Sequence, residues 1–181
     1  MGRPIQSGTN STTVAVFVDT NILVYSRDRA DPTKQAVASE WLKALWDDQS
    51  GRTSFQVLSE YYVTVTRKLR PAMTAEDAWS DVRELMAWRP QQGDALLLRE
   101  SREIEGRYQL SWWDSMIVAA ARLQNCASLL TEDLQHGGVI AGVRVINPFV
   151  HTVQQARAEY DVPRSSTIRT GHPPRGRPRK T

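Results

Sequence analysis

The sequence predicts an α/β fold with a parallel central sheet. Short, almost entirely apolar segments such as residues 14–18 are typical of strands that are buried on both faces of a parallel sheet. Such segments alternate with longer ones in which apolar residues recur at helical spacing, which is the pattern of βαβ units. The 181 residues, of which 40% are hydrophobic, are enough for roughly one domain with a sizeable core.

Five segments are candidates for the strands. Three of them are runs of apolar residues, and the run at residues 143–146 is closed by Asn147 and Pro148. The two others are shorter and less apolar. In chain order the predicted strands are residues 14–18, 52–54, 88–91, 127–131 and 143–146.

Helices are predicted where a capping residue precedes a segment of helical periodicity. Asp31 with Pro32 is typical of an N-cap followed by a first-turn proline, and Thr74 and Ser111 each begin a segment with capping-box spacing. Pro71 ends the helix before Thr74. In chain order the predicted helices are a short helix or turn at residues 22–25 and helices at about 31–46, 55–69, 74–86, 94–107 and 111–125, with further helical potential at 152–160.

The charge of the chain is concentrated at its C-terminal end. From Asp161 onward there are six Arg or Lys residues against one acid, whereas the remainder carries a net charge of −2. The sequence therefore predicts a polar N-terminal extension at residues 1–13, a folded domain at 14–150 and a C-terminal extension at 151–181 with a disordered basic tail. The tail cations are candidates for sequence-independent contacts with RNA phosphates: Arg175, Arg177, Arg179 and Lys180.

Several classes of protein are excluded by what the sequence lacks. No run approaches the roughly 20 apolar residues that span a bilayer, and residues 1–13 contain no apolar segment of a secretory signal. The single cysteine, Cys126, forms neither an internal disulfide nor a zinc cluster, which fits the reducing cytoplasm. No glycine-rich motif for a nucleotide cofactor follows a strand.

Four acids lie where an α/β fold concentrates its chemistry. Asp19 directly follows the first predicted strand and Asp133 follows the strand at residues 127–131, so both lie at the carboxyl edge of the sheet. Asp114 is in the first turn of a predicted helix and Glu60 is inside another. Clustered carboxylates repel one another, and a divalent cation removes that repulsion; oxygen-only ligands suit Mg²⁺ or Mn²⁺.

Each acid taken singly also has a local explanation. Asp19 and Asp133 are common residue types in turns, Asp114 has the spacing to complete a capping box with Ser111, and a helical Glu60 is commonly solvated. The two tryptophans before Asp114, at positions 112 and 113, are expected to pack rather than to stack on an RNA base.

The order and spacing of the four acids resemble the successive motifs of PIN-domain ribonucleases. The similar segments are Val-Phe-Val-Asp-Thr-Asn-Ile-Leu at 16–23, Val-Leu-Ser-Glu-Tyr-Tyr at 57–62, Trp-Asp-Ser-Met-Ile-Val-Ala-Ala-Ala at 113–121, and Leu-Thr-Glu-Asp-Leu at 130–134. Within that family, the size and the motif order look most like VapC toxins of VapBC toxin–antitoxin modules. The resemblance covers residues 14 to about 150.

The resemblance implies a three-layer α/β/α PIN-like domain, with a parallel central sheet of about five strands, that acts as a Mg²⁺-dependent endoribonuclease, with Mn²⁺ as a substitute. It carries the acidic site over to Asp19, Glu60, Asp114 and Asp133, with Asp19 and Asp114 as direct metal ligands and the other two completing the pocket. Asp133 rather than the adjacent Glu132 fits the family motif. Products with a 3′-hydroxyl and a 5′-phosphate, homodimerisation and inhibition by a cognate VapB-like antitoxin are also implied.

Three other functions are compatible with parts of the sequence. One is a stand-alone PIN-type nuclease that processes RNA. Another is a non-catalytic RNA-binding domain. The third is a phosphohydrolase with a nucleophilic aspartate after the first strand, although the phosphatases of that kind carry a second aspartate where this chain has Asn21.

Overall fold

The computed structural model describes residues 14–150, which form a five-stranded, mostly parallel sheet between two layers of helices. The strand order is β2-β1-β3-β5-β4, in which β1, β2, β3 and β5 are parallel neighbours and β4 is antiparallel to β5. The predicted fold class is confirmed. The strands are β1 (Val16–Val18), β2 (Gly51–Arg52), β3 (Ser128–Leu130), β4 (Val139–Ile140) and β5 (Val143–Ile146).

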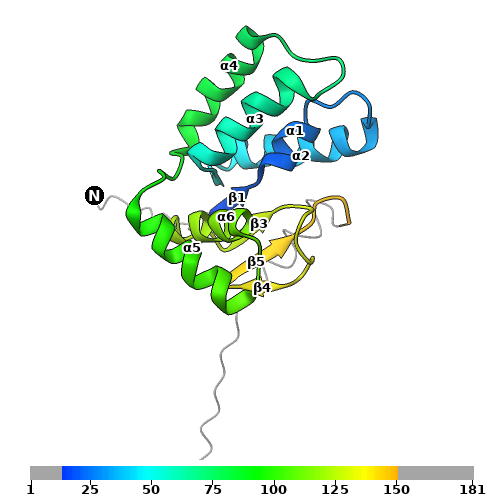
Figure 1. Cartoon of the computed structure of the whole chain (residues 1–181). Coiled ribbons are helices and arrows are strands. Elements are labelled where there is room, and N and C mark those ends of the chain that lie inside the picture. Colours follow the sequence, from blue (N-terminus) through cyan, green and yellow to red (C-terminus); the bar gives the residue numbers. More distant parts are fainter. Residues whose placement is uncertain (1–13, 151–181) are drawn as a thin grey trace, which may run out of the picture.

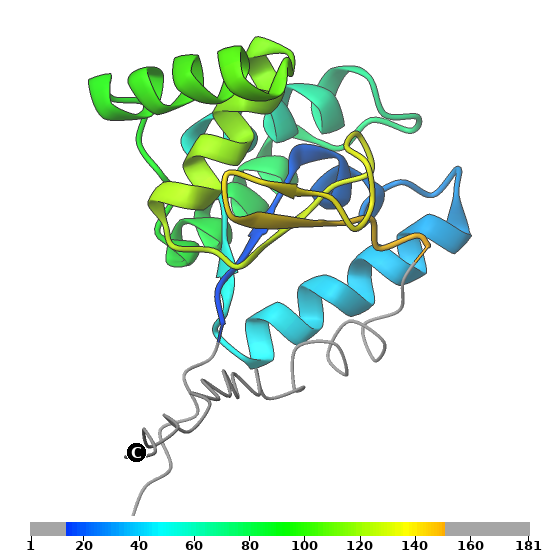
Figure 2. The same cartoon turned by 90° about the horizontal axis from the view of Figure 1, so that it is seen from below.

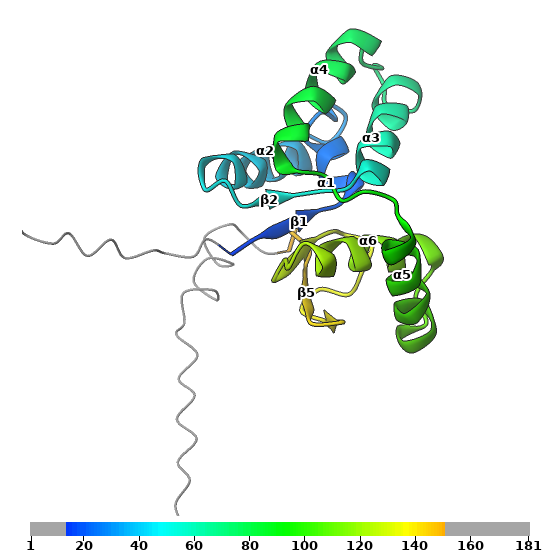
Figure 3. The same ribbon diagram turned by 90° about the vertical axis from the view of Figure 1, so that its left-hand side faces the viewer.

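Helices cover both faces of the sheet. Helices α1 to α4 lie on one side of β1 and β2, and α5 and α6 lie on the other side (Figures 1 and 3). Figure 2 shows the sheet from below, with α2 on one side of it and the pair α5 and α6 on the other. The helices are α1 (Thr20–Tyr25), α2 (Pro32–Asp47), α3 (Phe55–Arg67), α4 (Ala75–Leu85), η1 (Met86–Trp88, a 3₁₀ turn), α5 (Ala95–Tyr108) and α6 (Trp112–Leu123).

The N-caps predicted at Asp31, Thr74 and Ser111 are confirmed, and Ser54 and Asp94 are further N-caps. In each of the five longer helices, a side-chain oxygen of the capping residue accepts a hydrogen bond from a backbone N–H in the first turn, which satisfies a donor that the helix itself leaves unpaired. The capping residues are Asp31, Ser54, Thr74, Asp94 and Ser111.

The central strands are buried and bring two chain segments together at the carboxyl edge of the sheet. Every residue of β1 and β3 is buried, as the apolar runs predict for the middle of a parallel sheet. Beyond the strands the ladder continues, because the Asp19 N–H donates to the Leu130 carbonyl at 3.0 Å and the Thr131 N–H donates to the Ile146 carbonyl at 3.1 Å. The backbone thus fixes Asp19 and Thr131 beside each other.

One predicted strand is wrong and one strand was not predicted. Residues 88–91 are not a strand of the sheet, because Trp88 ends a 3₁₀ turn and Arg89 has a left-handed backbone with φ of 53°. Only Gln91 forms an isolated parallel bridge, with Ser54. The fifth strand is β4, which pairs with β5 as a short hairpin.

Trp88 packs closely over the edge strand β2. Its indole is 3% exposed and lies against the Cα of Gly51, where an added Cβ would be 2.4 Å from Cε2 of the indole. The indole also contacts Trp46, with 5.1 Å between the ring centroids. Glycine is therefore required in β2 by the close approach of the indole.

The remaining predictions of structure lie outside the described residues. These are the N-terminal extension at residues 1–13, the helical segment at 152–160 and the basic tail with Arg175, Arg177, Arg179 and Lys180. Among the helices of residues 14–150, none combines the length and the apolar character needed to cross a membrane. Cys126 is buried, and burial raises the pKa of its thiol to about 12, as expected for a core residue.

Candidate active site

A cavity of about 450 Å³ opens at the carboxyl edge of the sheet and is lined by all four predicted acids. The structure adds Asp28 as a fifth acid and places no Lys, Arg or His among the lining residues that it describes. The lining residues are Asp19, Thr20, Asn21, Val24, Tyr25, Asp28, Gln56, Glu60, Thr64, Trp113, Asp114, Ile117 and Asp133. Five carboxylates thus share one cavity without a basic side chain among them.

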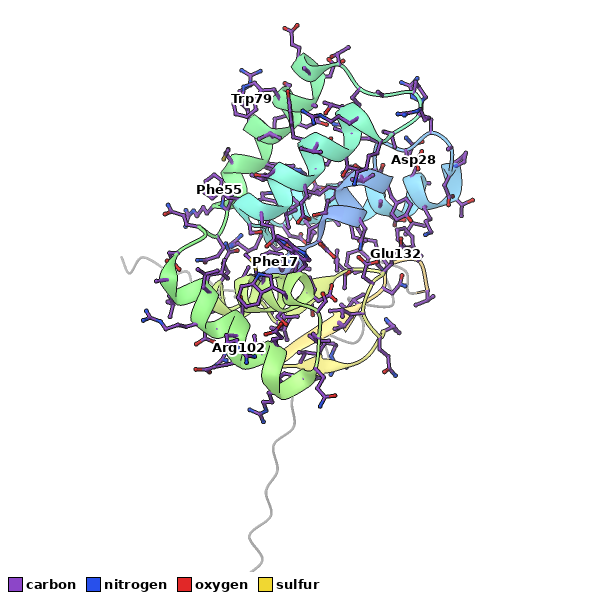
Figure 4. All side chains as sticks on the ribbon, in the orientation of Figure 1. Phe17, Asp28, Phe55, Trp79, Arg102 and Glu132 are labelled. Atoms are coloured by element: carbon purple, nitrogen blue, oxygen red, sulfur yellow. The ribbon has the colours of Figure 1, made fainter. Side chains whose placement is uncertain are left out.

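Three helices form the walls of this acidic pocket. Helix α1 begins directly after β1 and lines one side, and Asp28 follows it. Helix α3 contributes Gln56, Glu60 and Thr64, which are spaced by four residues and therefore lie along one face of the helix. The first turns of α6 supply Trp113, Asp114 and Ile117. Figure 4 shows Asp28 and Glu132 on the same side of the molecule, with Phe17 of β1 in the middle.

Asp19 is the most buried acid of the pocket and is held through both carboxylate oxygens. Its side chain is 8% exposed. The backbone N–H of Thr20 donates to Oδ1 at 2.6 Å, and the Thr131 hydroxyl donates to Oδ2 at 2.7 Å. The Asn21 amide donates to the same Oδ2 at 3.3 Å. These contacts fix the direction in which the carboxylate points into the pocket.

Burial raises the pKa of Asp19 to about 6. The hydrogen bonds from Thr131 and Thr20 lower it, because they favour the charged form, whereas the nearby carboxylates of Asp133 and Glu60 raise it by like-charge repulsion. The acid thus lies in an environment that favours its protonation, and a bound cation would reverse that preference.

Asp19 should make the stability of the protein depend on pH when a chelator is present. Between the pKa of 3.8 in the unfolded chain and about 6 in the folded one, the folded state binds more protons. The free energy of unfolding should therefore fall as the pH rises through this window, by about 3 kcal/mol from this residue. Urea denaturation near pH 4 and near pH 7 measures the loss. Asp19→Asn should lack this component, and an equal pH dependence in both proteins would contradict the assignment.

Asn21 connects the acids at the ends of β1 and β3. Its amide nitrogen donates to Oδ2 of Asp133 at 2.9 Å and to the Thr131 hydroxyl oxygen at 3.2 Å, and the Asp133 N–H donates to the same hydroxyl oxygen. The Asn21 Oδ1 atom is buried and has no hydrogen-bond partner among the described residues. Asn21 lines the pocket, and this oxygen is thus able to accept a further contact.

Glu132, the neighbour of Asp133, does not line the pocket. Its carboxylate accepts a hydrogen bond from the Tyr25 hydroxyl and forms an ion pair with Lys34 at 2.5 Å. The Lys34 ammonium also lies 4.2 Å from the centre of the Tyr25 ring and 4.8 Å from that of Phe149. These contacts hold Glu132 behind the wall of the pocket, so Asp133 is the acid that faces it.

Asp114 both lines the pocket and takes part in the helix cap that its spacing predicts. Its N–H donates to the Ser111 hydroxyl oxygen at 3.1 Å, and that hydroxyl donates to Asp114 Oδ2 at 2.7 Å. Helix α4 repeats the same pair of contacts between Thr74 and Asp77, at 3.1 and 2.7 Å. The cap thus leaves one Asp114 oxygen, Oδ1, for another partner.

Glu60 is held by the neighbouring wall α1 and by its own helix α3. The Thr20 hydroxyl donates to Oε2 at 2.9 Å, and the Gln56 amide donates to Oε1 at 3.0 Å. The solvated position that a lone helical glutamate suggests is therefore not observed.

Some residues of the pocket were not predicted from the sequence, and one was misjudged. The sequence motifs contain three further residues whose pattern predicts no role, although their side chains orient the acids. These are Thr20, Asn21 and Thr131. Asp28 has no signal, because it follows a helix rather than a strand. The expectation that Trp113 is packed is wrong, since its side chain is 61% exposed at the pocket.

The pocket fits a divalent cation by its chemistry. Within residues 14–150, no three Asp, Glu, His or Cys side chains lie close enough together to form a ligand set. The carboxylates accept hydrogen bonds from neighbouring residues instead. The atoms of the pocket that could bind a metal are nevertheless oxygens. They include five carboxylates, with up to five negative charges, and the unpartnered Oδ1 of Asn21. Such a donor set suits Mg²⁺ or Mn²⁺ rather than a soft metal.

An α/β domain with an acidic pocket at the carboxyl edge of its sheet is the architecture that the sequence motifs predict. The family model of the PIN domain matches residues 16–138, and the chain belongs to this family, whose members are nucleases. The resemblance stated from the motifs and the three-layer fold are confirmed.

Solved structures share this fold at low sequence identity. One belongs to a toxin–antitoxin complex from Klebsiella pneumoniae, with 20% identity and a TM-score of 0.54 over 74% of this chain and 97% of the other. Another is VapC20 of Mycobacterium tuberculosis, described as a sarcin-ricin loop cleaving toxin, with 20% identity and a TM-score of 0.50 over 66% of this chain and 90% of the other. No curated protein sequence matches the chain.

Proposed function

We propose that this protein is a Mg²⁺-dependent endoribonuclease and the toxin of a toxin–antitoxin pair. It acts in the cytoplasm as a homodimer, accepts Mn²⁺ in place of Mg²⁺ and is inhibited by a VapB-like antitoxin. The observation that carries the proposal is the acidic pocket, in which five carboxylates and no basic side chain surround one cavity of a PIN domain. The descriptions of the two similar structures support the toxin assignment.

Asp19 and Asp114 would hold the ion, with Glu60 and Asp133 completing the site. When bound, the ion would neutralise charge on the phosphate and activate a water for in-line attack, leaving a 3′-hydroxyl and a 5′-phosphate. The chain itself provides orientation. Thr131 and the Thr20 N–H direct the Asp19 carboxylate, and Asn21 directs Asp133.

A nucleophilic role for Asp19 fits the contacts less well. Both of its oxygens accept hydrogen bonds from the protein, at 2.6 and 2.7 Å, which stabilises the carboxylate in place rather than leaving an oxygen ready to attack. Phosphatases with a nucleophilic aspartate carry a second aspartate where this chain has Asn21. The Asn21 amide donates a hydrogen bond to Asp19 and cannot act as a general acid.

The activity is tested on an end-labelled single-stranded RNA, with a DNA strand of the same sequence as control. Cleavage of the RNA should need Mg²⁺ or Mn²⁺, stop with a chelator and give 5′-phosphate ends that a 5′-phosphate-dependent exonuclease degrades. Cleavage that continues in the chelator, or intact RNA in Mg²⁺, would refute the enzyme assignment. Growth arrest on expression, absent for Asp19→Asn, distinguishes a toxin from a stand-alone processing nuclease.

Divalent ions should also raise the melting temperature of the protein. Binding to the folded state alone adds about 1.4 kcal/mol at an ion concentration ten times the Kd, which for a domain of this size is a shift of roughly 3–6 °C. Thermal denaturation of wild type, Asp19→Ala and Asp114→Ala with increasing Mn²⁺ measures it. Both variants should lose the shift, whereas the same shift in all three proteins would place the ion elsewhere.

A further inference from the structure

We propose that Trp113 is a stacking platform for an unpaired RNA base beside the cleaved phosphodiester bond. This inference rests on the proposed ribonuclease function and adds the residue that binds the base. It also assigns a base-binding residue that the family motif of acids does not include.

Trp113 is the most exposed tryptophan of the chain, ahead of Trp79 at 52% and Trp46 at 39%. Its side chain is 61% exposed, whereas Trp41 and Trp88 are 4% and 3% exposed in the core. Large aromatic side chains gain much from burial, so an exposed indole in a well-packed domain is a candidate contact for a ligand. Among the aromatic pairs within residues 14–150, Trp113 has no ring partner.

The position of Trp113 is fixed with respect to the acids. It lies in the first turn of α6, directly before Asp114, and both residues line the acidic pocket. Ile117, one turn further along the same helix, is 5% exposed and also lines the pocket, so the apolar wall continues inward from the indole. A nucleotide whose phosphate lies at the acids therefore has an aromatic face beside it.

The charge of the pocket favours stacking as the source of affinity. Lysine and arginine contacts with phosphates supply most of the affinity of nucleic-acid-binding proteins. None of the described lining residues is basic, and the acids repel the RNA backbone. Stacking on an indole is independent of sequence and requires no basic side chain, which makes it compatible with an acidic pocket.

A platform of this kind accepts only an unpaired base. In a double helix both faces of each internal base are covered by its neighbours, whereas bases in loops and single strands can turn out and stack on aromatic side chains. Because Trp113 and the acids line the same pocket, a base stacked on the indole places the backbone of its nucleotide near the carboxylates.

The test measures binding separately from cleavage. All proteins carry Asp19→Asn so that the RNA stays intact, and fluorescence anisotropy gives the Kd for a labelled single-stranded RNA of mixed sequence. Trp113→Ala should weaken binding about 5- to 150-fold, the range that loss of one stacked base implies. Trp113→Phe should keep most of the affinity. Trp79→Ala is the matched control, because Trp79 is 52% exposed on α4 and projects away from the pocket (Figure 4).

Two further probes separate stacking from a structural effect. An abasic strand of the same length should bind with equal affinity whether or not the protein carries Trp113→Ala, since it has no base to stack. The duplex of the same RNA should bind more weakly than the single strand, and Trp113→Ala should reduce that preference. Equal affinity of the Trp113→Ala and Trp79→Ala proteins for single-stranded RNA would overturn the inference. So would a loss of affinity of Trp113→Ala for the abasic strand as large as its loss for the normal strand. Failure of the wild type to cleave would instead contradict the proposed activity.

Discussion

Asp19→Asn should reduce RNA cleavage by more than about 100-fold while leaving the fold intact. Even the removal of a hydrogen-bond partner behind a metal ligand costs roughly 10–100-fold in affinity or activity, and this change removes the charge of a proposed ligand itself. The shape is kept, and the oxygen of the new amide can still accept the hydrogen bond from the Thr131 hydroxyl, so the site should not collapse. The measurement is the initial rate of RNA cleavage in Mg²⁺, with the melting temperature as a check of folding.

Asp114→Asn should have an effect of the same size, and the chain offers a matched control for it. Asp77 has the same position in the first turn of α4 and the same two contacts with a capping hydroxyl, at 2.7 and 3.1 Å, but it lies outside the pocket. Asp77→Asn should therefore cost the same cap energy and no activity. If Asp114→Asn cleaves RNA as fast as Asp77→Asn does, Asp114 is a helix cap and no more.

Gly51→Ala should destabilise the domain by about 3 kcal/mol, at the upper end of the usual cost of overpacking a core. The new Cβ would lie 2.4 Å from Cε2 and 2.6 Å from Cζ2 of the Trp88 indole, which is itself held against Trp46. The indole has to leave its position in the core, or β2 has to leave β1. Urea denaturation gives the change in the free energy of unfolding.

Gly93→Ala is the control for that change. An added Cβ at Gly93 meets no atom within 4 Å, so its stability should stay near that of the wild type. Trp88→Leu is expected to destabilise the protein by itself, yet it should make Gly51→Ala less costly when the two are combined, because the clash is removed. If the two changes were simply additive, the contact between Gly51 and the indole would not be the cause.

Most of the fold follows from local patterns of sequence, and the exceptions have physical reasons. The central strands were predicted because burial on both faces requires a continuous run of apolar residues. The helices were predicted because a hydroxyl or carboxylate capping residue precedes a segment of helical periodicity. Strand β4 has only two residues, and its hairpin turn places Ala141 and Gly142 at φ of 50° and 87°. Positive φ at both central turn residues is usually signalled by Asn-Gly or Asp-Gly, and alanine gives no such signal. The β-like pattern at residues 88–91 corresponds to the packing of Trp88 on β2 and to a single bridge at Gln91.

The site was predictable in part. Asp19 and Asp133 follow from the rule that ligands bind at the carboxyl edge of a parallel sheet. Glu60 and Asp114 lie on helices, and only the resemblance to a family linked them to that edge. The structure brings all four to one pocket, but their roles as ligands stay predictions. The prediction for Trp113 is wrong because helical periodicity indicates which side of a helix can face the core. It does not show that the first turn of α6 borders an open pocket instead of another packed element.

The two outermost strands of the described sheet restrict how another chain can attach. Strands β2 and β4 have two residues each, so either edge offers too few free N–H and C=O groups to template an added strand. A second copy or an antitoxin would therefore bind through side chains of the helices rather than by extending the sheet. Substitutions on helix surfaces, and not backbone changes at the edges, should then decide which partner the protein accepts.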